Sequence, residues 1–290
     1  MPRPDPIRSN SRRFAPPGAV LLFAVAAVAG AQDVPSYRAG RALDEIHVDG
    51  RLDEFTWAAA PRLGAFTDIR DAASDEFLTQ AAIAWDDQYF YAAFVCVDSE
   101  PWGTLTERDA HLWEEEVVEV FLDPQGDGEN YPELEVSPDN VVVDLLIPAP
   151  GRVSADEAAR WDIAGLRTAV ARHARGWTVE IAIPWASLSE AGVEGPPKIG
   201  ERWRVGMYRI ERPGGPERAR RSAEARRRGD EAEVERLTAD HRFLAWSKTE
   251  RSFHEPEKFG IVEFAERPWG AWSTKHLSRL FTNLVLCDTC

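Results

Sequence analysis

The chain has 290 residues and a formal net charge of -15, because 49 Asp and Glu outnumber 34 Lys and Arg. This excess of negative charge disfavours a protein that follows nucleic-acid phosphates, which repel an anionic surface. Hydrophobic residues make up 44% of the chain and aromatic residues 10%, so the composition excludes both a disordered chain and a small scaffold held by disulfides. The 11 Trp residues indicate a recognition surface, since indole combines a large apolar face with one N–H donor.

The N-terminal segment 1–31 has the pattern of a signal peptide. Arginines precede an apolar run from Ala19 to Ala29, and small residues lead to a cleavage site after Ala31. The apolar run is much shorter than the ~20 residues that cross a bilayer. We therefore expect export to the periplasm, cell surface or outside of the cell, with no stable membrane insertion after cleavage.

The segment 32–265 alternates apolar runs with turn sequences at intervals of about ten residues, as is typical of an all-β sandwich. We expect two hairpins and five further strands, at 78–86 with 88–98, 166–174 with 177–184, and 117–122, 131–136, 140–147, 202–212 and 259–264. The predicted fold class is therefore an all-β, antiparallel β-sandwich of the immunoglobulin-like or jelly-roll kind.

Three other features complete the predicted organisation. The segment 213–241 mixes Arg with Glu and has almost no large apolar residue, which predicts a solvated helical insertion rather than a site for polyanions. Cys96 lies in an apolar run and is expected to be buried. The tail 266–290 ends in a pair, Cys287 and Cys290, which lacks the second ligand pair of a zinc site.

The segment 46–57 is predicted to form a strand, a turn and a short helix. Asp49 and Gly50 supply turn chemistry, Asp53 is placed to cap the helix, and Trp57 is expected in the core. These roles are structural.

The segment 108–124 carries the strongest candidate site residues. A loop with Trp113 enters a strand in which Glu119 shares a face with Val117 and Phe121. A carboxylate on an apolar face requires a partner or a ligand. Glu119 is therefore predicted to line a pocket.

Four segments together resemble the family 9 carbohydrate-binding modules, which belong to the DOMON-like sandwich group and accompany some xylanases. They are DGRLDEFTW at 49–57, LWEEEVVEVFLDP at 112–124, GWTVEIAIPW at 176–185 and FHEPEKFG at 253–260. The resemblance covers residues 46–264. It implies an exported, non-catalytic sandwich that binds an oligosaccharide or polysaccharide, with a role in polysaccharide catabolism.

The resemblance also implies the site. In sugar-binding members two aromatic side chains clamp a terminal sugar while polar groups bind its hydroxyls; Trp113 matches the first aromatic, Glu119 the carboxylate, and Phe253 the second aromatic. Arg108 and Asp109 are added as polar candidates. The chain departs from the family pattern in having Phe253 for Trp and Glu135 where an Arg is expected, and these changes put sugar specificity in question.

No cofactor is required by this interpretation, although known members bind structural calcium. Asp49, Asp53, Glu54 and Asp98 have the oxygen ligands that calcium prefers. The alternative for these residues is that they are ordinary solvated carboxylates.

Three competing functions remain open. Catalysis is disfavoured because the chain has no Gly-x-Ser-x-Gly elbow, HExxH sequence or phosphate-binding loop, although its likeness to xylanase-associated modules invites a glycoside hydrolase label. Haem binding would use Met207 with one of His47, His111, His173, His241 or His254. A sandwich that lost its sugar site and serves as an interaction domain is the nearest rival.

Overall fold

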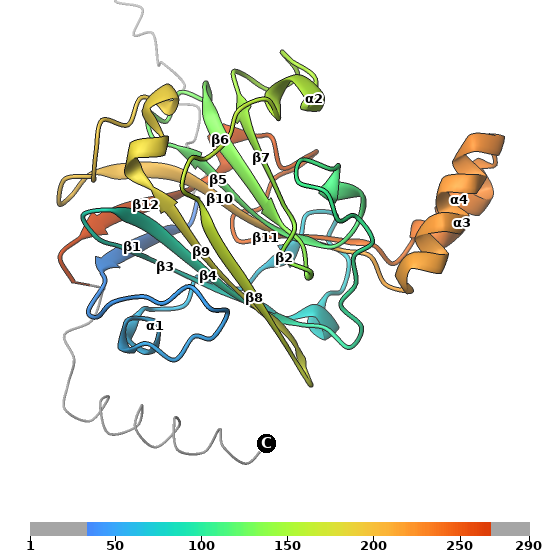
Figure 1. Cartoon of the computed structure of the whole chain (residues 1–290). Helices are drawn as coiled ribbons and strands as arrows, with labels where there is room; N and C mark the ends of the chain where they lie inside the picture. The colour runs from blue at the N-terminus through green and yellow to red at the C-terminus, as the bar shows by residue number, and fades with distance from the viewer. Residues whose placement is uncertain (1–33, 268–290) are drawn as a thin grey trace, which may run out of the picture. The chain divides into compact units, whose positions relative to one another are not determined.

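The computed structural model describes residues 34–267, which form a curled β-sheet with short helices outside it (Figure 1). The predicted signal peptide and the pair Cys287 and Cys290 lie outside the described residues. The strands are β1 (Ser36–Arg41), β2 (Thr67–Asp68), β3 (Thr79–Trp85), β4 (Tyr89–Val97), β5 (Val117–Asp123), β6 (Tyr131–Val136), β7 (Val142–Ile147), β8 (Arg167–His173), β9 (Gly176–Pro184), β10 (Arg202–Glu211), β11 (Arg242–Ala245) and β12 (Gly260–Ala265).

The helices are short apart from the pair in the insertion. The α-helices are α1 (Phe55–Ala59), α2 (Ala155–Ala158), α3 (Gly215–Arg228) and α4 (Glu231–Thr238). Single 3₁₀ turns are η1 (Asp75–Phe77), η2 (Leu112–Glu114), η3 (Trp185–Ser187), η4 (Ser189–Ala191) and η5 (Pro256–Lys258). No described helix has the length and apolar character needed to cross a membrane.

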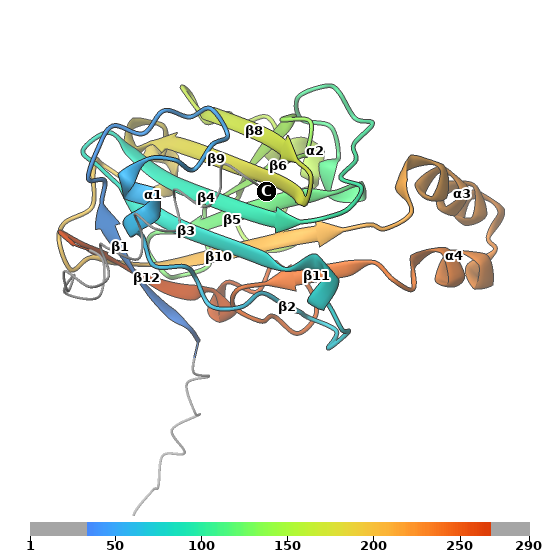
Figure 2. The same cartoon turned by 90° about the horizontal axis from the view of Figure 1, so that it is seen from below.

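The strands form one hydrogen-bonded sheet in the order β7-β6-β5-β10-β12-β1-β3-β4-β9-β8, with β11 paired to β10 and β2 paired to β11. The sheet curls so that its two halves face each other (Figures 1 and 2). The inner core lies between them, because β3, β4 and β9 from one half and β5, β6 and β10 from the other contribute alternate apolar residues to one buried cluster. The predicted β-sandwich is thus confirmed.

The predicted hairpins are confirmed, as β3 pairs with β4 and β8 with β9 in antiparallel register. Three strands were not predicted, namely β1, β2 and β11. β1 pairs in parallel with both β12 and β3, so the sheet is not purely antiparallel. The expected burial of Cys96 and Trp57 is confirmed, since both are fully buried.

The segment before α1 holds a turn against the sheet without forming the expected strand at 46–48. The carboxylate of Glu180 in β9 accepts hydrogen bonds from Asp49 N at 3.0 Å, Gly50 N at 2.8 Å and Trp57 Nε1 at 2.7 Å. Gly50 has φ of +85°, and a Cβ there would lie 2.7 Å from Ala171 N, so only glycine fits.

The predicted cap at Asp53 is wrong. The N-cap position of α1 is Glu54, whose side chain makes no capping hydrogen bond. Asp44 accepts hydrogen bonds from Phe55 N and Thr56 N, at 2.8 and 2.9 Å, and thereby satisfies the first turn. Local sequence rules look for the capping residue directly before the helix, so they do not predict one that lies ten residues upstream.

The predicted helical insertion is two helices, α3 and α4, that project away from the strands between β10 and β11 (Figure 2). Gly229 ends α3 with φ of +70°, and the Asp230 carboxylate accepts a hydrogen bond from Glu233 N at the start of α4. Ion pairs such as Arg220 with Glu217, at 2.7 Å, cover the exposed surface of α3.

Candidate functional site

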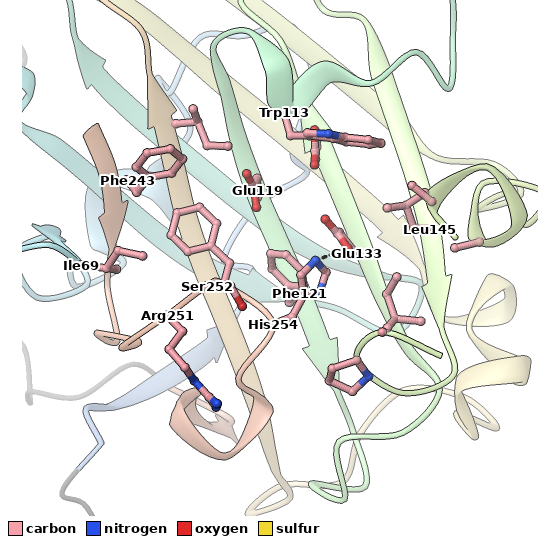
Figure 3. A pocket seen from close by; sticks show the side chains of 18 of the residues that line it. Ile69, Trp113, Glu119, Phe121, Glu133, Leu145, Phe243, Arg251, Ser252 and His254 are labelled. Carbon is pink, nitrogen blue, oxygen red and sulfur yellow. Dashed lines mark ion pairs between the residues drawn. The ribbon is translucent and has the colours of Figure 1, made fainter. Parts of the chain in front are cut away.

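A cavity of about 660 Å³ lies on the face of β5, β6 and β7 that points away from the inner core (Figure 3). Its walls come from β11, from α2 and from the loop before η5. The apolar and aromatic lining residues are Ile69, Trp113, Phe121, Leu145, Ile147, Val153, Ala158, Ile210, Phe243 and Phe253. An apolar hollow with a few converging polar groups is the usual form of a small-molecule site.

Three buried glutamates are among the polar residues that line the cavity. Glu119 comes from β5, and Glu133 and Glu135 come from β6; they are 2%, 3% and 1% exposed. One carboxylate oxygen from each lies within 4.8 Å of the others. Alternation along β5 puts Glu119 on the same face as Phe121, as predicted, and Glu119 stands opposite Glu135 in the β5–β6 pairing.

Two of the three carboxyl groups are incompletely satisfied. Glu133 Oε2 and Glu135 Oε2 are buried and have no hydrogen-bond partner. Figure 3 shows Glu119 and Glu133 projecting between Trp113 on one side and Phe121 and His254 on the other. Buried polar atoms without partners are costly, so this cavity has unused hydrogen-bonding capacity.

Burial and mutual repulsion hold protons on these groups. Burial raises the pKa of Glu133 to about 8. Burial and then the charge of Glu133 raise the pKa of Glu119, while burial and then Glu119 and Glu133 raise the pKa of Glu135. The nearby Arg212 opposes both of the latter shifts.

Two basic residues lie beside the glutamates. His254 Nε2 is 3.7 Å from Glu133 Oε2, and His254 Nδ1 is 2.9 Å from the hydroxyl of Tyr131. Burial lowers the pKa of His254 below its ordinary 6.5, so this ring is neutral at neutral pH. Arg212 donates to backbone oxygens of Glu115 and Trp113 and contacts His241 Nδ1 at 2.8 Å, which positions the Trp113 loop.

The aromatic residues differ in how they are held. Trp113 is half-buried and stacks on His111 with ring centroids 4.4 Å apart. Phe253 is 8% exposed and stacks on Tyr208, with centroids 4.1 Å apart and planes 8° from parallel. Phe243 meets Phe253 edge to face at 6.2 Å. Trp113, Glu119 and Phe253 therefore all line one cavity, and Phe243 adds a ring that sequence reasoning missed.

Arg108 and Asp109 do not line this cavity. Arg108 Nε donates to Asp162 at 3.0 Å, and another of its nitrogens donates to the buried Asp144. Asp109 lies beside Arg108, with 3.7 Å between Oδ1 and Nε. The structure therefore places both in an ion-pair cluster outside the cavity.

The four expected calcium ligands do not form one cluster, because the acidic groups found among residues 34–267 contain Asp98 but not Asp49, Asp53 or Glu54. Asp49 accepts a hydrogen bond from Arg51 N, Glu54 accepts one from His47 N, and Asp98 lies in a different acidic cluster with Glu116 and Glu211. In that cluster the guanidinium of the fully buried Arg209 already pairs with Asp98, at 3.3 Å, and with Glu211.

The positions of Met207 and His254 do not favour haem binding. Met207 is fully buried in the inner core, where it packs among the apolar residues of β5, β10 and β12. It does not line the cavity, whereas His254 does.

Glu133 and Phe243 were not predicted as site residues. A sequence signal existed for Glu133, because alternation along 131–136 places it with Tyr131 and Glu135 on one face, as for Glu119. Phe243 gave no such signal, because β11 has four residues and its position depends on pairing with β10 and β2.

The arrangement brings hydrogen-bonding carboxyl groups and aromatic rings together in one cavity. The three carboxyl groups cluster on two adjacent strands, with one oxygen from each within 4.8 Å of the others. Clustered acceptors beside aromatic rings suit hydroxyl or cation recognition.

Comparison with known proteins gives concordant matches. The family described as carbohydrate family 9 binding domain-like matches residues 48–267. Exoglucanase XynX of Acetivibrio thermocellus is 27% identical over 142 residues, which are 49% of this chain and 12% of that protein. The chain therefore spans about an eighth of the length of this curated relative.

Solved structures show the same fold. A family 9 carbohydrate-binding module from Caldicellulosiruptor kristjanssonii in complex with cellotriose has a TM-score of 0.54 at 15% identity, over 82% of this chain and 97% of that chain. A putative carbohydrate-binding protein from Bacteroides uniformis has a TM-score of 0.56 at 14% identity, over 80% and 99% of the two chains. With the family match covering most of the sandwich, the chain belongs to the carbohydrate family 9 binding domain-like family.

Proposed function

We propose that this chain binds saccharide non-catalytically in the cavity on β5, β6 and β7. The observation that carries the proposal is the half-buried Trp113 beside three buried glutamates that line about 660 Å³ of largely apolar space. Family membership and the sugar complexes of structurally similar modules support the same ligand class.

The binding mode follows from the chemistry of a sugar ring. Its axial C–H face stacks on an aromatic plane, and its hydroxyls need strong acceptors to offset their lost hydration. Trp113 supplies the plane and Glu119 the acceptor. Phe253 forms the facing wall, where Tyr208 backs its ring and fixes its orientation.

We further propose that the protein is exported and acts in polysaccharide catabolism. Support comes from the signal-like sequence at 1–31 and from the likeness to Exoglucanase XynX. Accumulation of the protein in a periplasmic or culture fraction, dependent on residues 1–31, tests the export step.

The decisive experiment is a titration of intrinsic tryptophan fluorescence with xylo-, cello- and acidic oligosaccharides, with calcium or EDTA present. A saturable response that disappears in Trp113→Ala supports the proposal. Trp161→Ala is the matched control, because Trp161 is also half-buried but lines a different hollow.

The same titration separates the competing functions. No response to any sugar, in folded protein without a Soret band, would overturn saccharide binding and leave an interaction domain as the better account. A Soret band would instead support haem. Release of reducing ends would show catalysis.

For calcium, we propose the cluster of Asp98, Glu116 and Glu211 in place of the four carboxylates predicted from sequence. It lines a separate cavity of about 530 Å³, and Glu116 Oε1 is buried without a hydrogen-bond partner. A rise in melting temperature on adding calcium, lost in Glu116→Gln, is the expected result. No calcium-dependent change would leave the chain with no required cofactor.

A further inference from the structure

The cavity contains more carboxyl groups than a neutral sugar needs, and they can ionise when a cation binds beside them. We propose that its ligand is a sugar with a protonated amine, such as a glucosamine unit, whose ammonium group binds Glu119, Glu133 and Glu135. This inference rests on the proposed saccharide function and names its substrate class.

The three glutamates lack a dedicated cationic partner. Among the described residues, these glutamates have one contact of ion-pair type, at 3.7 Å between Glu133 Oε2 and His254 Nε2. The His254 ring is neutral at neutral pH, because burial lowers its pKa below 6.5. Arg212 lies near Glu119 and Glu135, but its nitrogens donate to Glu115 O and Trp113 O and contact His241.

The arginines on the cavity rim are also engaged elsewhere. Arg70 donates to the backbone oxygen of His241, and its guanidinium lies 4.7 Å from the Phe243 ring centre. Arg251 pairs with Glu255 at 3.0 Å, and its side chain is 81% exposed. The described part of the chain therefore gives these carboxyl groups no dedicated cation, and a cationic ligand would take that place by displacing their protons.

The hydrogen-bond donors of an ammonium group match the acceptors of the three glutamates. This group offers three N–H donors and no acceptor, while ionised carboxylates only accept. Glu133 Oε2 and Glu135 Oε2 are the buried acceptors without hydrogen-bond partners. Because Trp113 stands beside Glu119 in the cavity, an amine attached to a sugar ring can reach the glutamates while the ring stacks on the indole (Figure 3).

Other sugar classes fit less well. A uronic acid would add a fourth carboxylate to the cluster, and an N-acetyl group would replace the charge by a neutral amide. A bare divalent cation would find three carboxylates, but calcium takes six to eight oxygens in total and gains nothing from Phe243, Phe253 and Ile210. The apolar walls favour an organic cation.

The test compares three ligands of one backbone by calorimetry in EDTA: the glucosamine trisaccharide, its fully N-acetylated form and cellotriose. They differ only in the substituent at C2. We expect the glucosamine trisaccharide to bind about tenfold or more tightly than the other two. Its binding should also release protons, seen as a dependence of the measured heat on the buffer used.

Variants then assign the preference to the cluster. Glu133→Gln and Glu135→Gln should each reduce it to about threefold or less while binding of cellotriose persists. Glu129→Gln is the matched control, since it removes a carboxylate from an exposed loop position that does not line the cavity and should leave the preference unchanged.

Each other outcome counts against the inference in a distinct way. Equal affinity for all three sugars would overturn it and leave the proposed function standing, whereas no binding of any sugar would overturn both. Putrescine binding as tightly as the glucosamine trisaccharide would show that the site recognises charge without a sugar ring. Sugar binding that appears only with calcium would assign the cluster to a metal.

Discussion

Glu119 on β5 and Glu135 on β6 stand directly opposite each other in an antiparallel pair, and both side chains are buried. Two carboxylates at facing positions repel each other when both are ionised, and burial strengthens the repulsion because little water screens it, so the pKa values of both groups are raised. The sheet keeps this unfavourable pair where the cavity lies. A site that binds a hydrogen-bond donor or a cation gives a physical reason for it.

Trp113→Ala should abolish saccharide binding and leave the melting temperature nearly unchanged. The side chain is half-buried, and the contacts that hold its loop, from Arg212, go to the Trp113 backbone oxygen and remain in the variant. Calorimetry and thermal unfolding measure the two effects. A large fall in melting temperature would instead place the indole in a structural role.

Phe253→Ala should behave differently, with a loss of about 3 kcal/mol in the free energy of unfolding as well as weaker binding. Phe253 is 8% exposed and stacks on Tyr208, so its removal leaves a hole in the outer cluster. Phe253→Leu keeps an apolar side chain without the ring and separates packing from stacking, because it should recover much of the stability and little of the sugar affinity. Unchanged stability in Phe253→Ala would contradict this packing role.

The protein should lose stability as pH rises from about 5 to 8. Glu133 has a pKa of about 8 in the folded chain against an ordinary value of 4.5, so the folded state binds the proton more tightly. That contribution is complete below about pH 4.5 and is lost as pH rises through 8. Urea unfolding at several pH values measures it.

Glu133→Gln should weaken this pH dependence, because an amide does not titrate, while burial of Glu116 and Glu211 also raises their pKa values and keeps part of the slope. Glu129→Gln, at an exposed loop position, is the control and should match the parent curve. The same pH profile in the parent and in Glu133→Gln would mean that Glu133 is ionised throughout the range.

Arg209→Met should cost about 3–5 kcal/mol of unfolding free energy, since it leaves Asp98 and Glu211 buried without their cation. Arg220→Met removes an arginine whose pair with Glu217 is exposed on α3, and it should cost less than about 0.5 kcal/mol. Urea unfolding measures both losses. Similar values in the two variants would show that the contribution of Arg209 to stability does not come from the burial of its cluster.

Replacing residues 215–238 by a short Gly-Ser linker should preserve the sandwich and its saccharide affinity. The two helices project away from the strands, and the linker retains Arg212 and His241, which support the Trp113 loop (Figure 2). Circular dichroism and the fluorescence titration test this. Loss of saccharide affinity in folded protein would show that the insertion contributes to the binding site.

Strict alternation explains why most strands were predicted. In β9, Trp177, Val179, Ile181 and Ile183 point into the inner core, so the sequence period of two directly records which face is buried. β1 was not predicted because its sequence, SYRAGR, has little apolar alternation. Its position in the sheet depends on parallel pairing with β12, which is more than 200 residues away in the chain.

The sequence by itself determined the sandwich, the charged helical insertion and the face of Glu119, because each depends on local periodicity or composition. Only the tertiary structure decided that Glu133, Glu135 and Phe243 join Glu119 and Trp113 in one cavity. It also decided that Arg108 and Asp109 lie outside it. Strand register and long-range packing set these relationships, and neither is encoded in the spacing of residues along a single strand.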